Sequence, residues 1–344
     1  MVPVYNAACR AVRPLLALAY TSACLSASPS HAQTTSAEVN KHIIVGRAAA
    51  DPDFPGYRRL CDVNNVGARA IDVRGLDATS PHSAMKIFDN LFFVSDYPAN
   101  TNPIAPAAYV IKTSEGLILI DTLNNTDDAV KIIEPGIRKV GLDPADIKYI
   151  IVTHSHGDHY GGAAYLAEKY KARVVSSEVD WVDMERQAKT PPNNPRWAAP
   201  PKRDMVVADG QVLKVGDTEV KFYVTPGHTN GTLSTVFPVF DNGVRHTAMM
   251  WGGNGFGANV TLLRQYGEQA RRMEPVARDA KVDVVISNHL FRDGGDVKMA
   301  QLEKRVPGEA HTYVLGQARA LKLFTVLSEC AAAKLLHTPS APTN

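Results

Sequence analysis

Short apolar runs separated by turn residues dominate the chain from about residue 88 onward. Most of these runs are four to nine residues long and rich in valine and isoleucine, which favours β-strands. Glycine-containing turns at residues 114–116, 216–217 and 241–243 separate neighbouring runs and predict three hairpins. The predicted strands are 91–94, 107–111, 117–120, 149–152, 174–175, 212–215, 218–225, 232–240, 244–250 and 282–286.

Helical patterns alternate with these strands. Thr126 is a predicted helix N-cap, because Asp127 and Asp128 follow it in the first turn, where the helix dipole favours negative charge. The predicted helices are 126–141, 161–171, 181–187, 261–280 and one from about residue 309, in which Val314, Ala318, Leu321 and Phe324 recur at helical spacing. This alternation predicts a single α/β domain over residues 89–344, with sheets inside and helices outside.

The N-terminal part of the chain has a different character. Arg10 and Arg13 precede a short apolar segment, residues 15–25, and small residues precede a cleavage site after Ala32, so residues 1–32 are a predicted signal peptide. The alternatives are a buried N-terminal helix and a lipoprotein signal ending at Cys24. Residues 33–88 show little periodicity, and we expect an irregular extension packed on the core. A cleaved signal predicts a periplasmic or secreted protein.

Composition excludes two classes of partner. The 344 residues are 45% hydrophobic and 21% charged, with a formal net charge of +2, as in ordinary soluble domains. Because basic residues do not cluster, we do not expect nucleic-acid binding. After the predicted signal peptide, no segment approaches the roughly 20 apolar residues that a membrane span requires.

Signal cleavage would remove Cys9 and Cys24 and leave Cys61 and Cys330. In an oxidising compartment these two cysteines are candidates for one disulfide between the N-terminal extension and the C-terminal helix. Two separate buried thiols are the alternative. Neither cysteine has the spacing of a metal ligand.

The strongest chemical signal is the segment Thr153-His154-Ser155-His156-Gly157-Asp158-His159. Three imidazoles and a carboxylate within six residues are costly to bury unless a cation binds them, and both groups are standard zinc ligands. In extended backbone, alternate side chains point the same way, so we expect His154, His156 and Asp158 on one side and His159 turned away. Because the segment follows a predicted strand, the ligands would lie at the carboxyl edge of a sheet.

This segment resembles the signature of the metallo-β-lactamase superfamily, and three other segments agree with it in the same order. They are residues 116–122, which end in Asp121-Thr122, then Thr225-Pro226-Gly227-His228-Thr229, and last Ser287-Asn288-His289. The resemblance covers about residues 88–305. It implies a four-layer αβ/βα sandwich of two mixed sheets with helices on the outer faces, and it makes Asp121 a carboxylate that supports the ligands.

The resemblance also implies a site for two zinc ions. One ion is expected on His154, His156 and His228, and the other on Asp158, His159 and His289. A hydroxide held by the metals would attack a carbonyl of a small-molecule substrate, and Asp158 would orient it or relay a proton. Four other histidines of the mature chain match no family position, and we expect no metal on them: His42, His82, His246 and His311.

One departure narrows the resemblance. Many hydrolases of this superfamily carry a bridging aspartate where this chain has Gly253, in the segment Trp251-Gly252-Gly253-Asn254. Without that carboxylate the site is most similar to subclass B3 metallo-β-lactamases, and the nitrogen-rich ligand set favours zinc. The same absence weakens a thioesterase interpretation of the glyoxalase II type. Asn254 is a candidate substrate contact, with an ordinary loop amide as the alternative.

The resemblance leaves the substrate open, because one fold hosts many activities. We expect opening of a cyclic amide of β-lactam type, with a lactone, ester or other amide hydrolase as the alternative and a non-catalytic periplasmic zinc-binding protein as a remote one. The loops expected to contact substrate are residues 97–106, 181–203 and 251–260. Arg196 and Lys202 are candidates for binding a substrate carboxylate, although exposed cations in such loops are usually only solvated.

Overall fold

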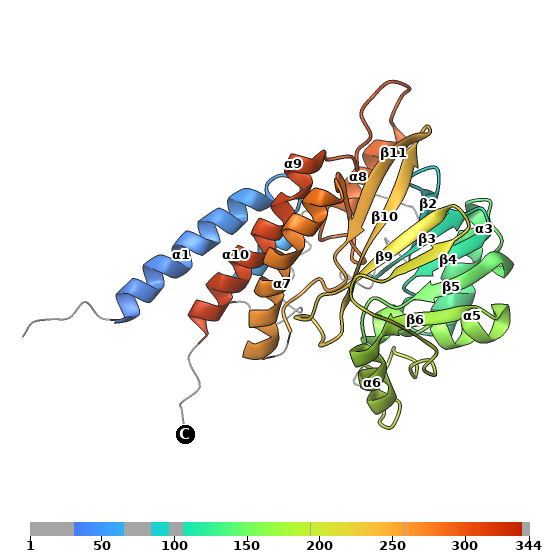
Figure 1. The fold of residues 1–344 in the computed structure, drawn as a ribbon, viewed down its shortest axis with the longest axis horizontal. Coiled ribbons are helices and arrows are strands. Elements are labelled where there is room, and N and C mark those ends of the chain that lie inside the picture. Colours follow the sequence, from blue (N-terminus) through green and yellow to red (C-terminus); the bar gives the residue numbers. More distant parts are fainter. Residues whose placement is uncertain (1–30, 65–83, 96–105, 193, 258, 339–344) are drawn as a thin grey trace, which may run out of the picture.

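Two β-sheets lie face to face at the centre of the protein, with helices on their outer sides (Figure 1). This computed structural model describes residues 31–64, 84–95, 106–192, 194–257 and 259–338. Most of the predicted signal peptide and the predicted substrate loop 97–106, apart from Pro106, therefore lie outside the described residues, as does His82.

The first sheet has seven strands in sequence order, with antiparallel pairs through β4 and parallel pairs from β4 to β7. Its inner strands are continuous apolar runs because both of their faces are buried. The strands are β1 (Ala84–Lys86), β2 (Leu91–Ser95), β3 (Ala107–Thr113), β4 (Gly116–Ile120), β5 (Ile147–Ile151), β6 (Arg173–Ser177) and β7 (Met205–Val207).

The second sheet has five strands in the order β12-β11-β10-β9-β8. All of its pairs are antiparallel except β11 with β12, which is parallel. The strands are β8 (Val212–Val215), β9 (Thr218–Val224), β10 (Leu233–Asp241), β11 (Val244–Met250) and β12 (Val284–Ile286). The three hairpins predicted from glycine-containing turns are confirmed, as β3–β4, β8–β9 and β10–β11.

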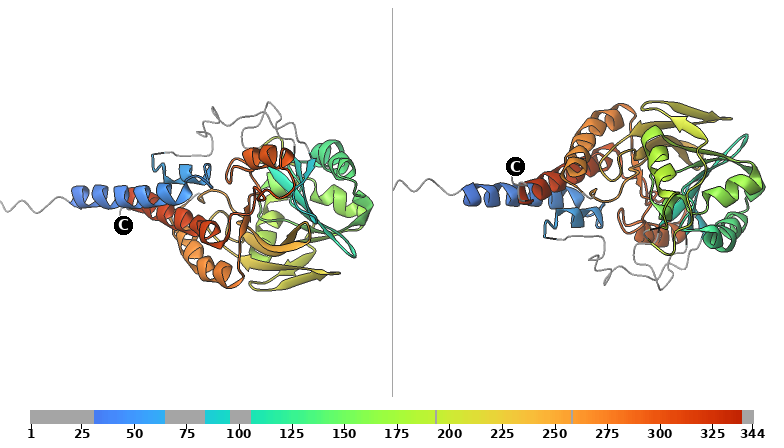
Figure 2. Two further views of the ribbon diagram at one scale, coloured as in Figure 1. Left: turned by 90° about the horizontal axis from the view of Figure 1, so that it is seen from above. Right: turned by 90° about the horizontal axis from the view of Figure 1, so that it is seen from below.

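Helices cover the outer face of each sheet (Figures 1 and 2). Against the first sheet lie α2 (Thr126–Asp128), a π-helical turn (Ala129–Ile133), α3 (Glu134–Lys139), α5 (Ala163–Tyr170) and α6 (Glu178–Gln187). On the side of the second sheet lie α1 (His31–Ala50), α7 (Val260–Asp279) and α10 (Lys322–His337). Shorter elements are η1 (Tyr57–Cys61), η4 (Pro144–Asp146), α4 (Gly157–Tyr160), α8 (Gly295–Glu303) and α9 (Gln317–Ala320).

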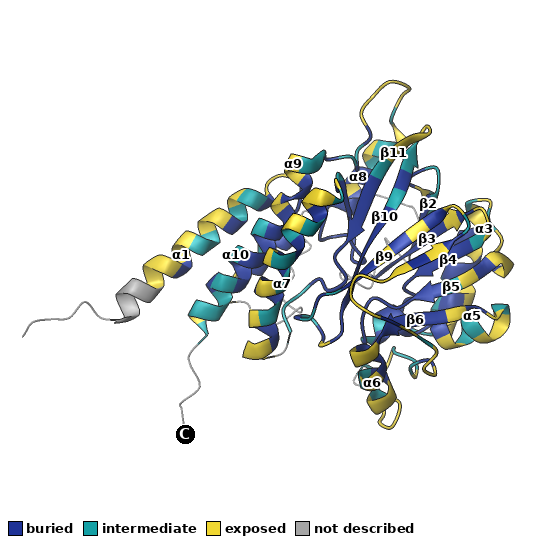
Figure 3. Cartoon of the chain, viewed as in Figure 1, coloured by how far each residue is buried: buried dark blue, intermediate teal, exposed yellow. Residues whose placement is uncertain are grey.

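Three apolar clusters fill the three interfaces between these layers. Phe93 and Tyr109 of the first sheet and Phe237 of the second belong to the cluster between the sheets. A second cluster lies between the first sheet and its helices, and a third between the second sheet, α7 and α10. Figure 3 shows the resulting pattern, in which β10 and the inner strands of the first sheet are mostly buried, whereas the outer helix faces and parts of β8, β9 and β11 are exposed. The predicted four-layer αβ/βα sandwich is confirmed.

The prediction that residues 33–88 are irregular is wrong for the first part of the segment. Residues 31–50 form α1, which runs alongside α10 (Figures 1 and 2). Val39 and Ile43 pack with Val63 and Ala333. The apolar stripe of α1 is weak. Its helical structure is therefore stabilised mainly by packing against the apolar face of α10. A disulfide joins Cys61, at the end of η1, to Cys330 of α10.

Two helix ends differ from the prediction. The helix expected from about residue 309 begins only with α9 and α10, because Val314 pairs with Val284 at the edge of the second sheet and Gly316 then turns the chain with φ 75°. At α2 the N-cap is Asn125 rather than Thr126, and its side chain accepts a hydrogen bond from the Asp128 N–H. Among the described helices, none combines the length and apolarity needed to cross a bilayer.

Candidate metal centre

Six side chains from three distant segments meet at the carboxyl ends of β5, β9 and β12. They form two groups, His154 with His156 and His228, and Asp158 with His159 and His289. Within each group the potential ligand atoms lie within 4.8 Å of one another. The groups adjoin, because the rings of His154 and His159 have centroids 4.0 Å apart. These are the same two sets that the sequence predicts as ligands of two ions.

The backbone of the histidine segment differs from the extended form expected from its alternating pattern. Residues 154–156 form a bend, and Gly157–Tyr160 is the short helix α4, with His156 as its N-cap. The helical turn directs Asp158 and His159 to the second group, so the expectation that Asp158 shares a face with His154 and His156 is wrong. The turn packs closely against a loop, because a Cβ at Gly157 would lie 2.3 Å from Cγ of Trp197.

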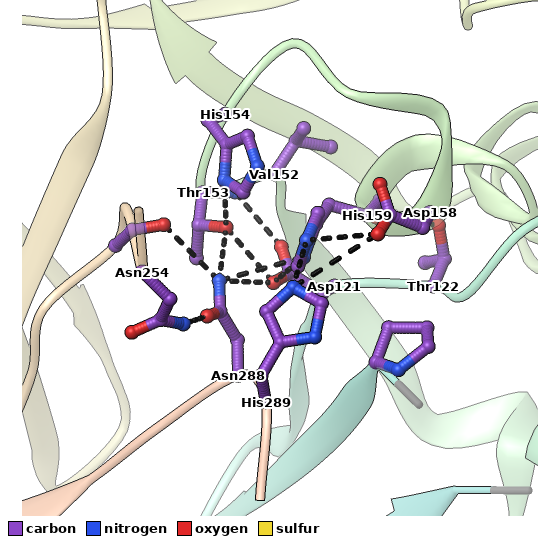
Figure 4. Close-up of polar contacts among 12 residues, drawn as sticks. Asp121, Thr122, Val152, Thr153, His154, Asp158, His159, Asn254, Asn288 and His289 are labelled. Atoms are coloured by element: carbon purple, nitrogen blue, oxygen red, sulfur yellow. Dashed lines mark hydrogen bonds and ion pairs between the residues drawn. The ribbon is translucent and has the colours of Figure 1, made fainter. Parts of the chain in front are cut away.

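Asp121 positions the second group through a contact with the ring of His159 (Figure 4). It follows β4 with φ 61°, and its Oδ2 lies 2.7 Å from Nδ1 of His159. The backbone N–H of Thr153 donates to Oδ1, at 2.9 Å, and Nδ2 of Asn288 donates to Oδ2, at 3.1 Å. With Nδ1 of His159 bound to the carboxylate, Nε2 is left facing Nε2 of His289, 3.2 Å away.

His228 is oriented by its own turn. A Cβ at Gly227 would lie 2.5 Å from Cα of Tyr266, and φ is 147° there, so only glycine fits before His228. Nδ1 of His228 lies 2.8 Å from the carbonyl oxygen of Gly255. If that nitrogen donates, Nε2 is the atom that remains as a ligand.

Asp180 of α6 ties the two ligand loops of the first group together, and the sequence did not point to this role. Its carboxylate accepts from the N–H of Ser155 at 3.0 Å, the hydroxyl of Thr229 at 2.9 Å and the N–H of Gly231 at 2.9 Å. Burial raises its pKa to about 7, although these hydrogen bonds act to lower it. The Ser177-x-x-Asp180 spacing is typical of a helix cap, but no local pattern indicates contacts with loops 50 residues away.

The donor set fits a metal cation. Nε2 of His154 is buried and has no hydrogen-bond partner among the described residues, which is unusual unless an ion binds it. Burial, followed by the neighbouring histidines, holds the pKa of His154 and His228 well below the usual value, so both imidazoles are neutral and available as ligands. Burial would raise the pKa of Asp158, but His159 and His289 outweigh it and keep the carboxyl ionised.

The other candidate residues lie elsewhere. Asn254 is buried, Tyr57 donates to its carbonyl and its amide donates to Asn288, and its contact with a substrate stays a prediction. Arg196 and Lys202 are exposed. None of the three described histidines expected to lack a metal belongs to either group, since each has another partner: His42 with Glu329, His246 with Asp283 and His311 with the Ile87 carbonyl.

Comparison with known proteins agrees with this geometry. The family model of the metallo-beta-lactamase superfamily matches residues 101–244. The fold is similar to that of BJP-1, a subclass B3 metallo-beta-lactamase of Bradyrhizobium japonicum, at 27% identity and a TM-score of 0.60 over 73% of this chain and 93% of that one. A mutant of the FEZ-1 enzyme of Legionella gormanii matches with a TM-score of 0.62, at 21% identity over 74% of this chain and 97% of that one.

Curated relatives match over shorter stretches. A hydroxyacylglutathione hydrolase of Rhodopseudomonas palustris is 40% identical over 88 residues, which are 26% of this chain. The match spans only 28% of that relative's length.

Proposed function

Since the chain belongs to the metallo-beta-lactamase superfamily, we propose that it is a two-zinc hydrolase that opens a cyclic amide of β-lactam type. The observation that supports this proposal is the donor set, which has five imidazoles and one carboxylate. It leaves no space for a second carboxylate that would bridge two metal ions. A Cβ at Gly253 would lie 2.4 Å from Cβ of His228, so a carboxylate there would displace a ligand. The nitrogen-rich set favours zinc among the common divalent metals.

Each group of three would hold one ion. Two zinc ions bound there would supply a water activated near neutral pH and would polarise the scissile carbonyl. Asp158 differs from the other ligands because it has two oxygens, and its Oδ2 lies 3.6 Å from Nε2 of His159. If a metal took one of these oxygens, the other would be available to accept a hydrogen bond from the attacking water and to hold its proton.

The compartment forms part of the proposal. A cleaved signal peptide before residue 33 would deliver the protein to the periplasm or outside the cell, where β-lactams are encountered. The Cys61–Cys330 disulfide supports an oxidising compartment. Production of the protein would then raise the β-lactam concentration that a bacterium tolerates.

Thioester hydrolysis is the second candidate. The hydroxyacylglutathione hydrolase is 40% identical over 88 residues, whereas BJP-1 is 27% identical over its longer match. The steric conflict at Gly253 opposes it, since thioesterases of this superfamily are expected to carry the bridging aspartate. A lactone or ester hydrolase remains the alternative within the same donor set.

One panel separates these candidates. Purified zinc-loaded protein is assayed with a chromogenic cephalosporin, an acylated glutathione thioester and a simple lactone, with and without a chelator. We expect the cephalosporin to give the highest kcat/KM and the chelator to abolish it. A higher kcat/KM for the thioester or the lactone would show that the protein is a hydrolase of that substrate class instead. Full zinc loading without turnover of any substrate would indicate a zinc-binding protein.

A further inference from the structure

Arg292 is a buried cation three residues after the metal-group residue His289. Only 7% of its surface is exposed. Nη1 donates to the carbonyl oxygen of Gly56 at 3.0 Å, while Nε is buried and has no hydrogen-bond partner in the part of the chain that the structure describes. The guanidinium lies 4.6 Å from the ring centroid of Phe291 and 5.9 Å from that of Tyr57, so aromatic faces rather than acids surround it.

No carboxylate among the described residues forms an ion pair with Arg292. The adjacent Asp293 instead faces Lys298, with 3.8 Å between Oδ2 and Nζ. Burial lowers the pKa of Arg292 to about 10, which still leaves it charged at neutral pH. A buried charge without a counter-ion is costly, and it is commonly retained where a ligand supplies the opposite charge.

The free end of this guanidinium lies beside the first metal group. The point that a Cβ of Gly255 would occupy is 3.7 Å from Nη2 of Arg292 and 3.7 Å from Nδ1 of His228, and no other described atom outside its neighbours is closer. Gly255 is itself half-buried, so this point is near the surface. Because residue 255 has no side chain, no side-chain atom of that residue stands between this point and Nη2.

We propose that Arg292 determines substrate specificity by binding an anionic group, a carboxylate, of the substrate through Nη2. This rests on the proposed hydrolase function and narrows it to acyl compounds that carry a carboxylate a few bonds from the scissile carbonyl. The carbonyl lies over the metal groups and the carboxylate over Gly255. A planar guanidinium suits this task because its donors match the two oxygens of a carboxylate.

The test compares an acid with its neutral ester. 3-Mercaptopropionate and its methyl ester both present a thiol to the metals, and calorimetry measures their binding to zinc-loaded wild type, Arg292→Gln and Arg292→Lys. We expect Arg292→Gln to weaken binding of the acid about tenfold or more and binding of the ester less than about twofold, because a charged hydrogen bond is lost only for the acid. Arg292→Lys, which keeps the charge, should retain part of the preference.

The control is Arg245→Gln, an exposed arginine of β11 that belongs to neither group of potential ligands, which should leave the acid-to-ester ratio unchanged. An equal loss for acid and ester in Arg292→Gln, or a wild type that does not prefer the acid, would overturn the assignment. The wild-type comparison and Arg292→Lys still decide the matter if the glutamine variant fails to fold. Thiol binding does not require turnover, so failure of β-lactam hydrolysis alone would count against the proposed function and not against Arg292.

Discussion

The contacts of single residues distinguish the histidines that belong to the two groups of potential ligands from those that do not. His159 and His246 each place Nδ1 against a carboxylate, Asp121 and Asp283, at 2.7 and 2.6 Å. Only His159 has other potential ligand atoms, from Asp158 and His289, beside its free nitrogen. A carboxylate–histidine pair therefore supports a metal only where further donors converge on the other ring nitrogen.

This contrast predicts the effect of removing one imidazole. His289→Ala should lower zinc from about two ions per chain to about one, because two donors alone hold an ion weakly. Elemental analysis after dialysis measures the content. His246→Ala is the matched control and should keep both ions; equal zinc content in wild type and His289→Ala would refute the ligand assignment.

Gly253 makes a second residue-scale prediction. Gly253→Ala should lower the free energy of unfolding by about 1–3 kcal/mol through overpacking, and it should weaken zinc binding because the new Cβ would displace His228. Chemical denaturation and zinc titration measure the two effects. Gly255→Ala, whose Cβ would meet nothing closer than 3.7 Å, is the control for stability. A stable, fully loaded Gly253→Asp variant would contradict the steric argument against a bridging acid.

At the scale of elements, ion pairs fasten loops to strands. Asp241 ends β10, and Arg305, just after α8, donates to both of its oxygens, at 2.8 and 2.7 Å. This pairing lowers the pKa of Asp241 below its usual value of 3.8. The pair holds the segment after α8 against the β10–β11 hairpin. No local sequence pattern predicts that these two residues form an ion pair.

The lowered pKa of Asp241 sets the pH dependence of its contribution. A carboxyl with a depressed folded-state pKa adds stability that is present above 3.8 and is lost as pH falls through the folded value. Asp241→Asn should therefore cost about 1–2 kcal/mol in the free energy of unfolding at neutral pH, and the difference from wild type should shrink as the pH falls below 3.8. Urea denaturation at several pH values measures it.

A surface acid provides the control for this experiment. Glu219 lies 3.7 Å from Lys214, and both side chains are more than 60% exposed. Glu219→Gln should change stability by less than about 1 kcal/mol, because exposed pairs contribute little. A pH-independent loss in Asp241→Asn would show that packing, rather than the charge, accounts for its effect.

At the scale of the whole molecule, the N-terminal and C-terminal parts of the chain form one body. The Cys61–Cys330 disulfide connects residues 269 apart, and α1 lies along α10 (Figure 2). The same N-terminal segment reaches the site, because Gly56 accepts from Arg292 and Tyr57 donates to Asn254. The extension is thus part of the structure that supports the metal centre.

Removing this covalent link should lower overall stability. The double variant Cys61→Ser/Cys330→Ser is expected to lose about 3 kcal/mol of unfolding free energy, since a crosslink over a long loop restricts the unfolded chain. Denaturant titration with and without a reductant measures the loss. Reductant should bring wild type close to the double variant and leave the variant unchanged; a wild type insensitive to a reductant that is shown to cleave the bond would contradict the expected contribution.

The sequence by itself determined the strands other than the short β1 and β7, the three hairpins and the six residues of the two groups of potential ligands. Runs of valine and isoleucine between glycine-containing turns carry the strand signal locally, and His154 to His159 form a dense motif. His228 and His289 follow from the order of segments that resemble a known family. Local chemistry therefore indicated both the sheets and their functional edge.

Only the tertiary structure decided which residues support that edge. The helix α1, the late start of α10, Asp180 between two ligand loops and the burial of Arg292 against Gly56 all depend on contacts between segments far apart in the chain. Asn254 illustrates the reverse case, a loop amide that folding buries between Tyr57 and Asn288. Local patterns report backbone preference and ligand chemistry, whereas burial and partners arise only when the layers pack.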